Sequence, residues 1–304
     1  MKPGKKIGAQ RRKDRRRSGA GGKAYGRGKA RPPAGASGEK SAPKRKPSPP
    51  AQRRAAEAER PAHLWIYGRH AALAAIANPA RVIRRILIAE TALQWISEAR
   101  VPRQRLASLV EARREDFERA LHEGAVHQGV AVEVEDLPRA RLKDACEPGG
   151  DRRPVVVLDQ ITDPHNIGAI FRSAAAFGAR AIIVQDRRTP PLAGALAKAA
   201  AGAVEIVPCV EVVNIARALE GLKGLGYHCA GLAGEADAAI SALPEDRPAA
   251  LVLGAEGEGL RRLVAETCDR LYRIPISRRM ESLNVSNAAA VALYEIGRSW
   301  ERKL

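Results

Sequence analysis

The sequence predicts an α/β protein: a parallel sheet between layers of helices in residues 155–304, preceded by a small α/β domain and a basic tail. Two observations predict the sheet. Short apolar runs such as 155–158 (VVVL) and 250–253 (ALVL) are rich in branched residues, which suits strands buried on both faces. Segments of helical spacing, about ten residues long, separate the runs, as in a parallel sheet with helices on both faces.

Residues 1–60 differ in composition from the rest of the chain. They hold 20 Lys and Arg against 4 Asp and Glu, so they carry +16 of the total net charge of +18. With no Leu, Val, Phe or Trp, they cannot bury enough apolar surface to offset the entropy of ordering, and we expect disorder. Runs such as 11–17 (RRKDRRR) predict sequence-independent attraction to RNA phosphates. A solubilising tail or an expression linker is the alternative.

Several classes of protein find no support in the sequence. The four cysteines lie far apart without a CxxC pair, and the histidines form no HxxxH or HExxH pattern. We therefore expect buried or half-buried thiols in a reducing cytoplasm, with no disulfide and no metal site. No run approaches the roughly 18 apolar residues of a membrane span, and the tail lacks the apolar segment of a secretory signal. No GxGxxG follows the first strand of the sheet, so an ordinary dinucleotide fold is not indicated.

Residues 61–137 are expected to form the small α/β domain. Strands are predicted at 63–67, 84–89 and 130–134, with helices at 71–77, around 93–96 and from 117 towards Gly124. Scattered arginines give this domain basic faces, which is a weak indication of RNA binding. Residues 138–154 are rich in Pro and Gly and are expected to be a linker.

From residue 155 onward, strands and helices are expected to alternate. Gly178 should close the first helix, because glycine commonly follows the last residue of a helix. The expected strands are 155–158, 181–184, 204–207, 227–231, 250–253 and 271–276, and the expected helices are 167–177, 192–201, 212–222 and 287–300.

Three polar loops follow strands of this predicted sheet. The first leads to Asn166 and Arg172, the second is 254–259 (GAEGEG), and the third spans 277–286. Because open α/β sheets bind ligands at the carboxyl ends of their strands, the loops predict one composite site. Two glutamates in the second loop would repel an anion, which favours a neutral or cationic ligand over a phosphate. The alternative is that Asn166 and the Ser and Asn residues of the third loop cap helices and that Arg172 is simply solvated.

The same loops resemble the three motifs of the SpoU/TrmH family, RNA ribose 2′-O-methyltransferases of the SPOUT class. The matching segments are 166–168 (NIG) with Arg172, 253–257 (LGAEG), and 274–276 (IPI) with 282–286 (SLNVS). Segments 68–71 (GRHA) and 127–130 (HQGV) also resemble the substrate-binding domain of members that methylate a guanosine in large-subunit ribosomal RNA. Relatives often have Ser-Ala-Gly-Ala where this chain has AAGA at 200–203.

The resemblance implies a fold and ligands that the periodicity does not predict. It implies a deep trefoil knot, a rare exception to unknotted topology, with S-adenosylmethionine bound bent inside it and no metal. It also implies a homodimer, with the last helix as a candidate interface. The implied cofactor-binding residues are Leu253, Gly254, Gly257, Ile274, Ile276, Leu283 and Asn284, and the implied catalytic residues are Asn166, Arg172, Glu256, Ser282 and Asn284.

The implied reaction is transfer of a methyl group to a ribose hydroxyl, expected to be that of a guanosine in 23S ribosomal RNA. The resemblance assigns Arg172 the role of general base. A guanidinium normally stays protonated in proteins, so an Arg172 that stabilises the alkoxide and grips a phosphate is the other possibility. A tRNA ribose methyltransferase and a non-catalytic RNA-binding or ribosome-assembly protein are the alternatives.

Overall fold

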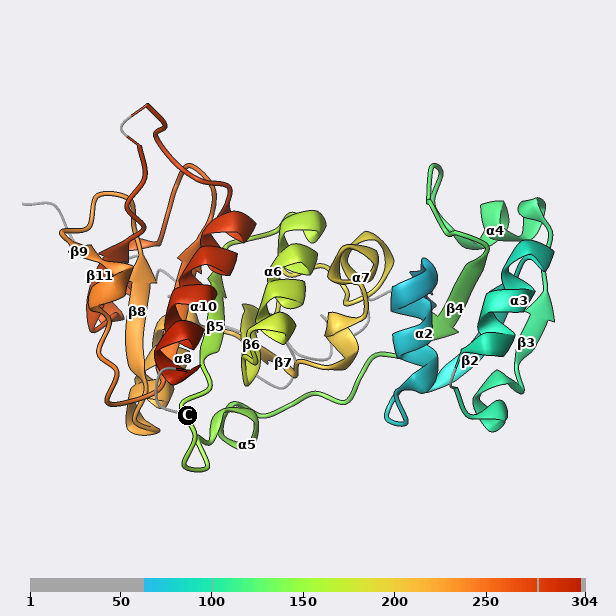
Figure 1. The fold of residues 1–304 in the computed structure, drawn as a ribbon, viewed down its shortest axis with the longest axis horizontal. Helices are drawn as coiled ribbons and strands as arrows, with labels where there is room; N and C mark the ends of the chain where they lie inside the picture. The colour runs from blue at the N-terminus through green and yellow to red at the C-terminus, as the bar shows by residue number, and fades with distance from the viewer. Residues whose placement is uncertain (1–62, 100, 278, 302–304) are drawn as a thin grey trace, which may run out of the picture. The chain divides into compact units, whose positions relative to one another are not determined.

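The computed structural model describes residues 63–99, 101–277 and 279–301, and the expected basic tail at 1–60 lies outside them. The described residues contain two sheets (Figure 1). One has four strands within residues 64–134, and the other has seven strands within residues 155–273.

The four-stranded sheet belongs to the small domain. Its strand order is β1-β4-β2-β3, with β4 antiparallel to β1 and β2, and β3 parallel to β2. Helices α2 and α3 cover one face, and α4 covers part of the other. The expected strands and helices are present, and β3 is a short strand that the sequence pattern did not predict. The bounds are β1 Leu64–Tyr67, α2 Arg69–Ala77, β2 Ile83–Ile88, α3 Glu90–Glu98, β3 Leu109–Glu111, α4 Arg114–Ala120 and β4 Val130–Val134.

The seven-stranded sheet has the order β7-β6-β5-β10-β8-β11-β9, and every pairing in it is parallel. The expected parallel sheet is confirmed. Its strands are β5 Val155–Asp159, β6 Ala181–Gln185, β7 Cys209–Val212, β8 His228–Leu232, β9 Ala238–Ala239, β10 Ala249–Gly254 and β11 Arg270–Arg273. The helices from residue 142 onward are α5 Leu142–Cys146, α6 Pro164–Ala176, α7 Gly194–Ala200, α8 Ile215–Gly224, α9 Arg262–Thr267 and α10 Val285–Glu301.

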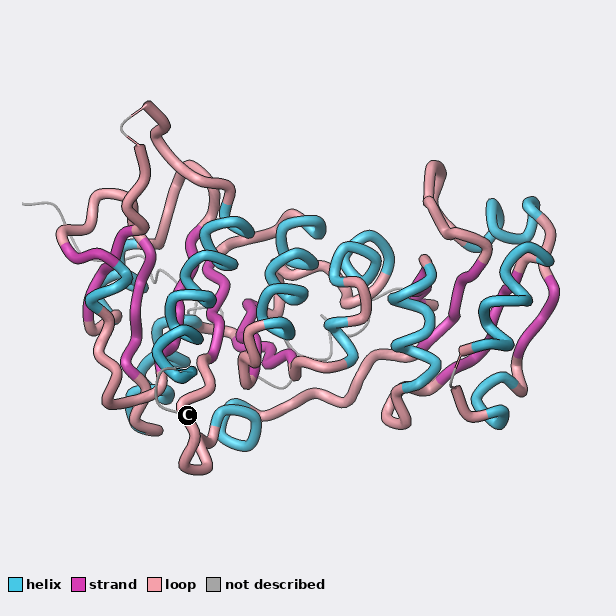
Figure 2. The backbone as a smooth tube through the Cα atoms, in the orientation of Figure 1, coloured by secondary structure: helices cyan, strands magenta, loops and turns pink. Residues whose placement is uncertain are grey.

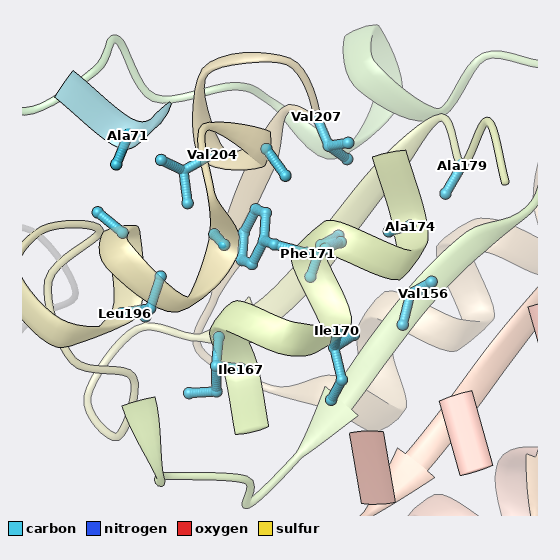
Figure 3. Close-up of a cluster of buried hydrophobic side chains, with 14 of the residues drawn as sticks. Ala71, Val156, Ile167, Ile170, Phe171, Ala174, Ala179, Leu196, Val204 and Val207 are labelled. Atoms are coloured by element: carbon cyan, nitrogen blue, oxygen red, sulfur yellow. The ribbon is translucent and has the colours of Figure 1, made fainter. Parts of the chain in front are cut away.

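Alternate residues of each central strand enter two different cores. Val156 of β5 packs in the core beneath α6 and α10, whereas Val155 and Val157 pack in the core with α8. Figure 3 shows the first of these cores around Phe171, which has no exposed surface. Truncating such a buried aromatic side chain to alanine costs about 3–5 kcal/mol. Burial on both faces explains why the strands consist of continuous apolar runs.

Helix α6 begins three residues earlier than its apolar spacing predicts. Asp163 caps it by accepting a hydrogen bond from the His165 N–H at 3.0 Å, and Pro164 occupies the first helical position. Gly178, with φ of 65°, follows the last turn in the left-handed conformation, as predicted. The earlier start places Asn166 inside the first turn, so Asn166 is not the helix cap.

Residues 204–207 do not form the predicted strand. The segment is instead the short 3₁₀ helix η2, Ala203–Glu205, entered through Ala201 and Gly202, both with positive φ. Branched residues favour strands only where sheet neighbours are available, and the strand beside β6 is the later segment β7. The following helix, α8, begins at Ile215 rather than 212 because the Asn214 side chain caps it.

The small domain and η2 share a buried ion pair. The guanidinium of Arg81 donates to both carboxylate oxygens of Glu205, at 2.6–3.2 Å, and to the carbonyl of Glu135 at 2.8 Å. The two side chains are 1% and 2% exposed. The Nδ2 group of Asn78 donates to Glu205 as well, at 2.7 Å. A buried charge pair with this many hydrogen bonds has its remaining donors and acceptors satisfied.

The cysteines are free, three buried and Cys209 half-buried, as predicted. Among the residues that the structure describes, no helix has the length and apolar character needed to span a membrane. Within the same residues, no group of three or more His, Cys, Asp and Glu side chains is arranged to hold a metal ion.

Candidate active site

The three polar loops lie at one edge of the large sheet. The loops follow β5, β10 and β11, and because all strands are parallel, their carboxyl ends share that edge. Figure 2 shows the connections as pink segments beyond the ends of the strands. Three side chains, one from each motif, meet there and form what we call the amide-carboxylate cluster: Asn166, Glu256 and Asn284.

Glu256 is the acceptor at the centre of this cluster. Its Oε1 accepts hydrogen bonds from Asn284 Nδ2 at 2.6 Å, from Asn166 Nδ2 at 3.2 Å and from the Val285 N–H at 3.3 Å. Asn284 Nδ2 also donates to Asn166 Oδ1 at 2.9 Å. One carboxylate oxygen therefore fastens the loop after β10 to the first turns of both α6 and α10.

Asn284 has a second function as the cap of α10. Its Oδ1 accepts from the Ser286 N–H at 3.0 Å and from the Asn287 N–H at 3.4 Å, while its Nδ2 serves the cluster. The cap explains why α10 begins at Val285, two residues before the predicted start. The capping alternative for the third loop is thus correct for Asn284, and it is compatible with a role in the site.

An ion pair between a buried carboxylate and a partly exposed guanidinium holds the loop after β10 in place. Asp159, at the end of β5, has no exposed surface and accepts from the Arg261 Nε at 2.8 Å, Nη2 at 2.5 Å and backbone N–H at 3.0 Å. Sequence reasoning missed both residues. The available signal was a charged residue directly after four buried apolar residues, where a carboxylate needs a partner.

The loop between Gly254 and Arg261 is a tight turn that closes on itself. The Gly259 N–H donates to the Ala255 carbonyl at 2.9 Å, and Gly257 and Gly259 have φ of 81° and 68°. A Cβ at Gly254 would lie 2.2 Å from the carbonyl carbon of Gly259. Only glycine fits at 254, because any side chain there would collide with the loop's own backbone.

The structure does not bring Arg172 or Ser282 into the cluster. Both are exposed, and neither side chain makes a hydrogen bond or ion pair with another residue that the structure describes. Positions six apart on a helix lie about 120° apart around the axis and about 9 Å apart along it, so Asn166 and Arg172 point in different directions.

The implied cofactor residues fall into two groups. Leu253 is buried at the end of β10, and Ile274 is half-buried against the core. Ile276 and Leu283, in the loop after β11, are each 38% exposed, and the neighbouring Met280 is more exposed. This loop presents apolar side chains to solvent beside the cluster, an arrangement that suits contact with a flat apolar group.

The two small-domain motifs, 68–71 and 127–130, lie side by side. The Arg69 N–H donates to Gln128 Oε1 at 3.0 Å, and Gln128 has a φ of 55°. His127 stacks on Phe117, with ring centres 4.0 Å apart, and its Nδ1 accepts from the Gly129 N–H at 3.2 Å. Burial, followed by the nearby charge of Lys198, lowers the pKa of His127, which favours the neutral ring.

Comparison with known proteins accounts for both parts of the described chain. Residues 153–294 match the SpoU rRNA Methylase family, and residues 65–140 match the domain called RNA 2′-O ribose methyltransferase substrate binding. A 23S rRNA (guanosine-2′-O-)-methyltransferase RlmB from Xylella fastidiosa is 39% identical over 244 residues, which cover 76% of this chain and 94% of the relative. The chain belongs to the SpoU rRNA methylase family.

Other SpoU relatives agree with this assignment. The Pseudomonas putida protein of the same name is 37% identical over 249 residues, covering 78% of this chain and 97% of its own length. The fold matches the SpoU methyltransferase AviRb from Streptomyces viridochromogenes, solved in complex with AdoMet, with a TM-score of 0.65 and 22% identity. That match covers 84% of this chain and 94% of AviRb. The SpoU/TrmH resemblance of the three loops is confirmed.

Proposed function

We propose that this SpoU protein transfers a methyl group from S-adenosylmethionine to the 2′-oxygen of a guanosine ribose in 23S ribosomal RNA. The observation that carries the proposal is the amide-carboxylate cluster, which unites one residue from each of the three family motifs at the carboxyl edge of the sheet. The relatives' printed activity and the matched substrate-binding domain support ribosomal RNA over tRNA as substrate.

The residues of the edge fit S-adenosylmethionine. The exposed apolar side chains Ile276 and Leu283 suit an adenine ring. The carboxylate of Glu256 suits a cationic sulfonium rather than a phosphate. We assign the donor site to Leu253, Gly254, Gly257, Ile274, Ile276, Leu283 and Asn284.

The reaction joins a weak nucleophile to an activated electrophile. The sulfonium methyl of the donor supplies the electrophile, and the ribose hydroxyl must lose its proton as the new bond forms. Developing negative charge meets positive charge in this step, so a water-poor site favours the transition state. The protein must hold the hydroxyl in line with the methyl group and stabilise the alkoxide.

The site residues divide this work. Arg172, exposed and without a protein partner among the described residues, is available to the RNA as a base or as a clamp on the alkoxide and adjacent phosphate. Asn166 orients the ribose, and Glu256 fixes the positions of Asn166 and Asn284 by accepting from both. We assign Ser282, in the same loop as Leu283, to shaping that loop around donor and acceptor.

The loop contacts support the trefoil knot. The Val285 N–H donates to Glu256, so the segment that enters α10 passes against the loop after β10.

We place residues 61–137 as the RNA-binding domain, 138–154 as the linker and 155–304 as the catalytic domain, acting in the cytoplasm where ribosomal RNA is found. Residues 1–60 add sequence-independent attraction to RNA.

Helix α10 supports a homodimer. Val291 and Tyr294 are exposed on it, and Tyr294 packs edge-on against Phe177 at the end of α6, with ring centres 6.1 Å apart. Together these side chains give α6 and α10 a shared apolar surface. A second copy of the chain would cover that surface.

The test is methyl transfer by the full chain from labelled S-adenosylmethionine to protein-free 23S rRNA, with tRNA as the competing substrate. We expect a single 2′-O-methylguanosine in 23S rRNA, located by nuclease digestion and mass spectrometry. Methylated tRNA with unmodified 23S rRNA would assign the protein to tRNA instead. Binding of RNA without transfer to either substrate would support the non-catalytic alternative.

A further inference from the structure

The small domain has a groove on its outer sheet face, away from α2 and α3. The groove has a volume of about 410 Å³ and runs between β2, β3 and α4. Its floor is apolar and its rim carries charges of both signs. The lining residues are Arg85, Leu87, Val110, Glu111, Ala112, Asp116, Arg119 and Ala120.

Arg85 is held flat at one end of this groove. Trp65, Glu133 and Arg85 occupy one row across β1, β4 and β2. The guanidinium lies over the Trp65 ring, 5.2 Å from its centre, and its Nε donates to Glu133 at 3.0 Å. Glu133 is nearly buried and is also paired with His63 at 2.5 Å. A guanidinium carries five N–H groups in a rigid plane, so four remain for a ligand once Nε is used.

One carboxylate side chain, that of Asp116, faces the same groove. Glu111 of β3 directs its side chain to the opposite face of the sheet, because its register partner Ile88 packs in the core beneath α2 and α3, whereas Leu87, the partner of Val110, packs with α4. Asp116 accepts from the Arg113 N–H at 2.9 Å and from Arg119 at 2.6 Å, which leaves acceptor capacity on an ionised carboxylate. A carboxylate at the rim disfavours a phosphate as the ligand, because the like charges repel.

We propose that this groove binds one unpaired guanine base of the RNA substrate. Single-stranded RNA is recognised by splaying bases onto aromatic or guanidinium planes and reading their edges through hydrogen bonds. Guanine offers N1–H and N2–H donors that match Asp116, and O6 and N7 acceptors that match the free N–H groups of Arg85. Leu87 and Val110 supply the apolar floor for the ring. This assignment rests on the proposed function, because it takes RNA to be the substrate.

The test measures binding of short single-stranded RNAs that differ at one central position. The full chain is titrated with heptamers carrying guanine, adenine or an abasic site, in about 0.3 M salt to screen attraction by residues 1–60. The variants are Arg85→Ala and Val110→Glu, the latter at an edge position that is 48% exposed. Arg84→Ala is the matched control, because Arg84 is the neighbouring exposed arginine of β2 and pairs with Glu135.

We expect wild-type protein to prefer the guanine heptamer, and Arg85→Ala to weaken that complex about 5- to 150-fold while sparing the abasic one. Val110→Glu should remove the preference too. Arg84→Ala should change all three affinities by similar factors. Circular dichroism and melting curves check that each variant is folded, and Val110→Glu keeps the test valid should Arg85→Ala unfold the domain by stranding Glu133.

Equal losses on guanine, adenine and abasic heptamers, or none, would overturn the groove assignment. That failure is separable from failure of the proposed function. Wild-type methyl transfer to 23S rRNA without any guanine preference overturns the groove alone. A guanine preference that vanishes in both groove variants upholds the groove even if the wild-type chain transfers no methyl group.

Discussion

Replacing Arg261 by leucine should destabilise the protein far more than replacing its partner Asp159 by asparagine. In Arg261→Leu, the Asp159 carboxylate remains, with no exposed surface and its main partner gone. Leaving a buried charge uncompensated costs about 3–5 kcal/mol. For a domain of this size, 1 kcal/mol shifts Tm by about 2–4 °C, so the expected loss is about 6–20 °C.

The reverse substitution leaves a charge that can reach water. The Arg261 side chain is 40% exposed, so in Asp159→Asn the guanidinium can rehydrate, and the new amide oxygen still accepts hydrogen bonds. Weakening these charge-assisted bonds costs about 1–2 kcal/mol, or roughly 2–8 °C in Tm. Arg262→Leu is the matched control, because Arg262 pairs with Glu266 on the surface of α9 and its loss should cost under about 1 kcal/mol.

The assay is calorimetry or urea denaturation at pH 7, with and without S-adenosylhomocysteine. At a hundredfold excess over its Kd, this ligand stabilises a protein that binds it by about 2.7 kcal/mol. Both variants should lose part of that increment, because the pair anchors the loop that carries Gly254 and Glu256. If Asp159→Asn costs as much as Arg261→Leu, the reasoning from burial is wrong. If S-adenosylhomocysteine stabilises both variants as much as the wild-type protein, the ion pair does not influence binding of the donor.

Three further predictions follow from charges described above. Arg172→Lys and Arg172→Ala should each reduce methyl transfer at least about a hundredfold, while S-adenosylmethionine affinity stays within a few fold. The reason is that the lysine ammonium lacks the planar, forked geometry of the guanidinium. Near-normal turnover of the Lys variant would refute both proposed roles. Glu205→Ala should cost about 3–5 kcal/mol in urea denaturation by stranding the buried Arg81, and a loss below 1 kcal/mol would contradict the buried pair. The pKa of His127 is lower in the folded protein than in the unfolded chain, so the unfolded chain binds the proton first as pH falls. The stability that neutral His127 contributes is therefore complete above the ordinary pKa of about 6.5 and is lost as pH falls below it. His127→Gln should therefore flatten the decline in Tm between about pH 7 and pH 5, and an unchanged decline would be the contrary result.

The sequence predicted the sheet and the meeting of the three loops for one physical reason. Runs such as 155–158 are apolar on both faces, which requires a covered parallel sheet, and parallel strands bring their following loops to one edge. Asn166, Glu256 and Asn284 could therefore be grouped in advance. Helix geometry also predicts that Arg172 points away from Asn166, but the motif places the two residues together without regard to that geometry.

Other features depended on contacts that no local pattern records. Asp159 and Arg261 lie 102 residues apart in the chain, and each resembles an ordinary polar residue after a strand or before a helix. Residues 204–207 have the composition of a strand, yet β7 takes the position beside β6 and the earlier segment turns instead. Local preference is overridden wherever tertiary neighbours decide.

The double use of Asn284 has a consequence for the order in which the cluster can form during folding. Asn284 contacts Asn166 across 118 residues of sequence and can hold it in place only when α10, which it caps, is wound and docked on α6. A nascent chain that has emerged only as far as β11 has the sheet and the first two loops, but neither the cap nor the helix that completes the cluster. The three motifs are therefore united last, when the segment after β11 folds into α10 and docks on α6.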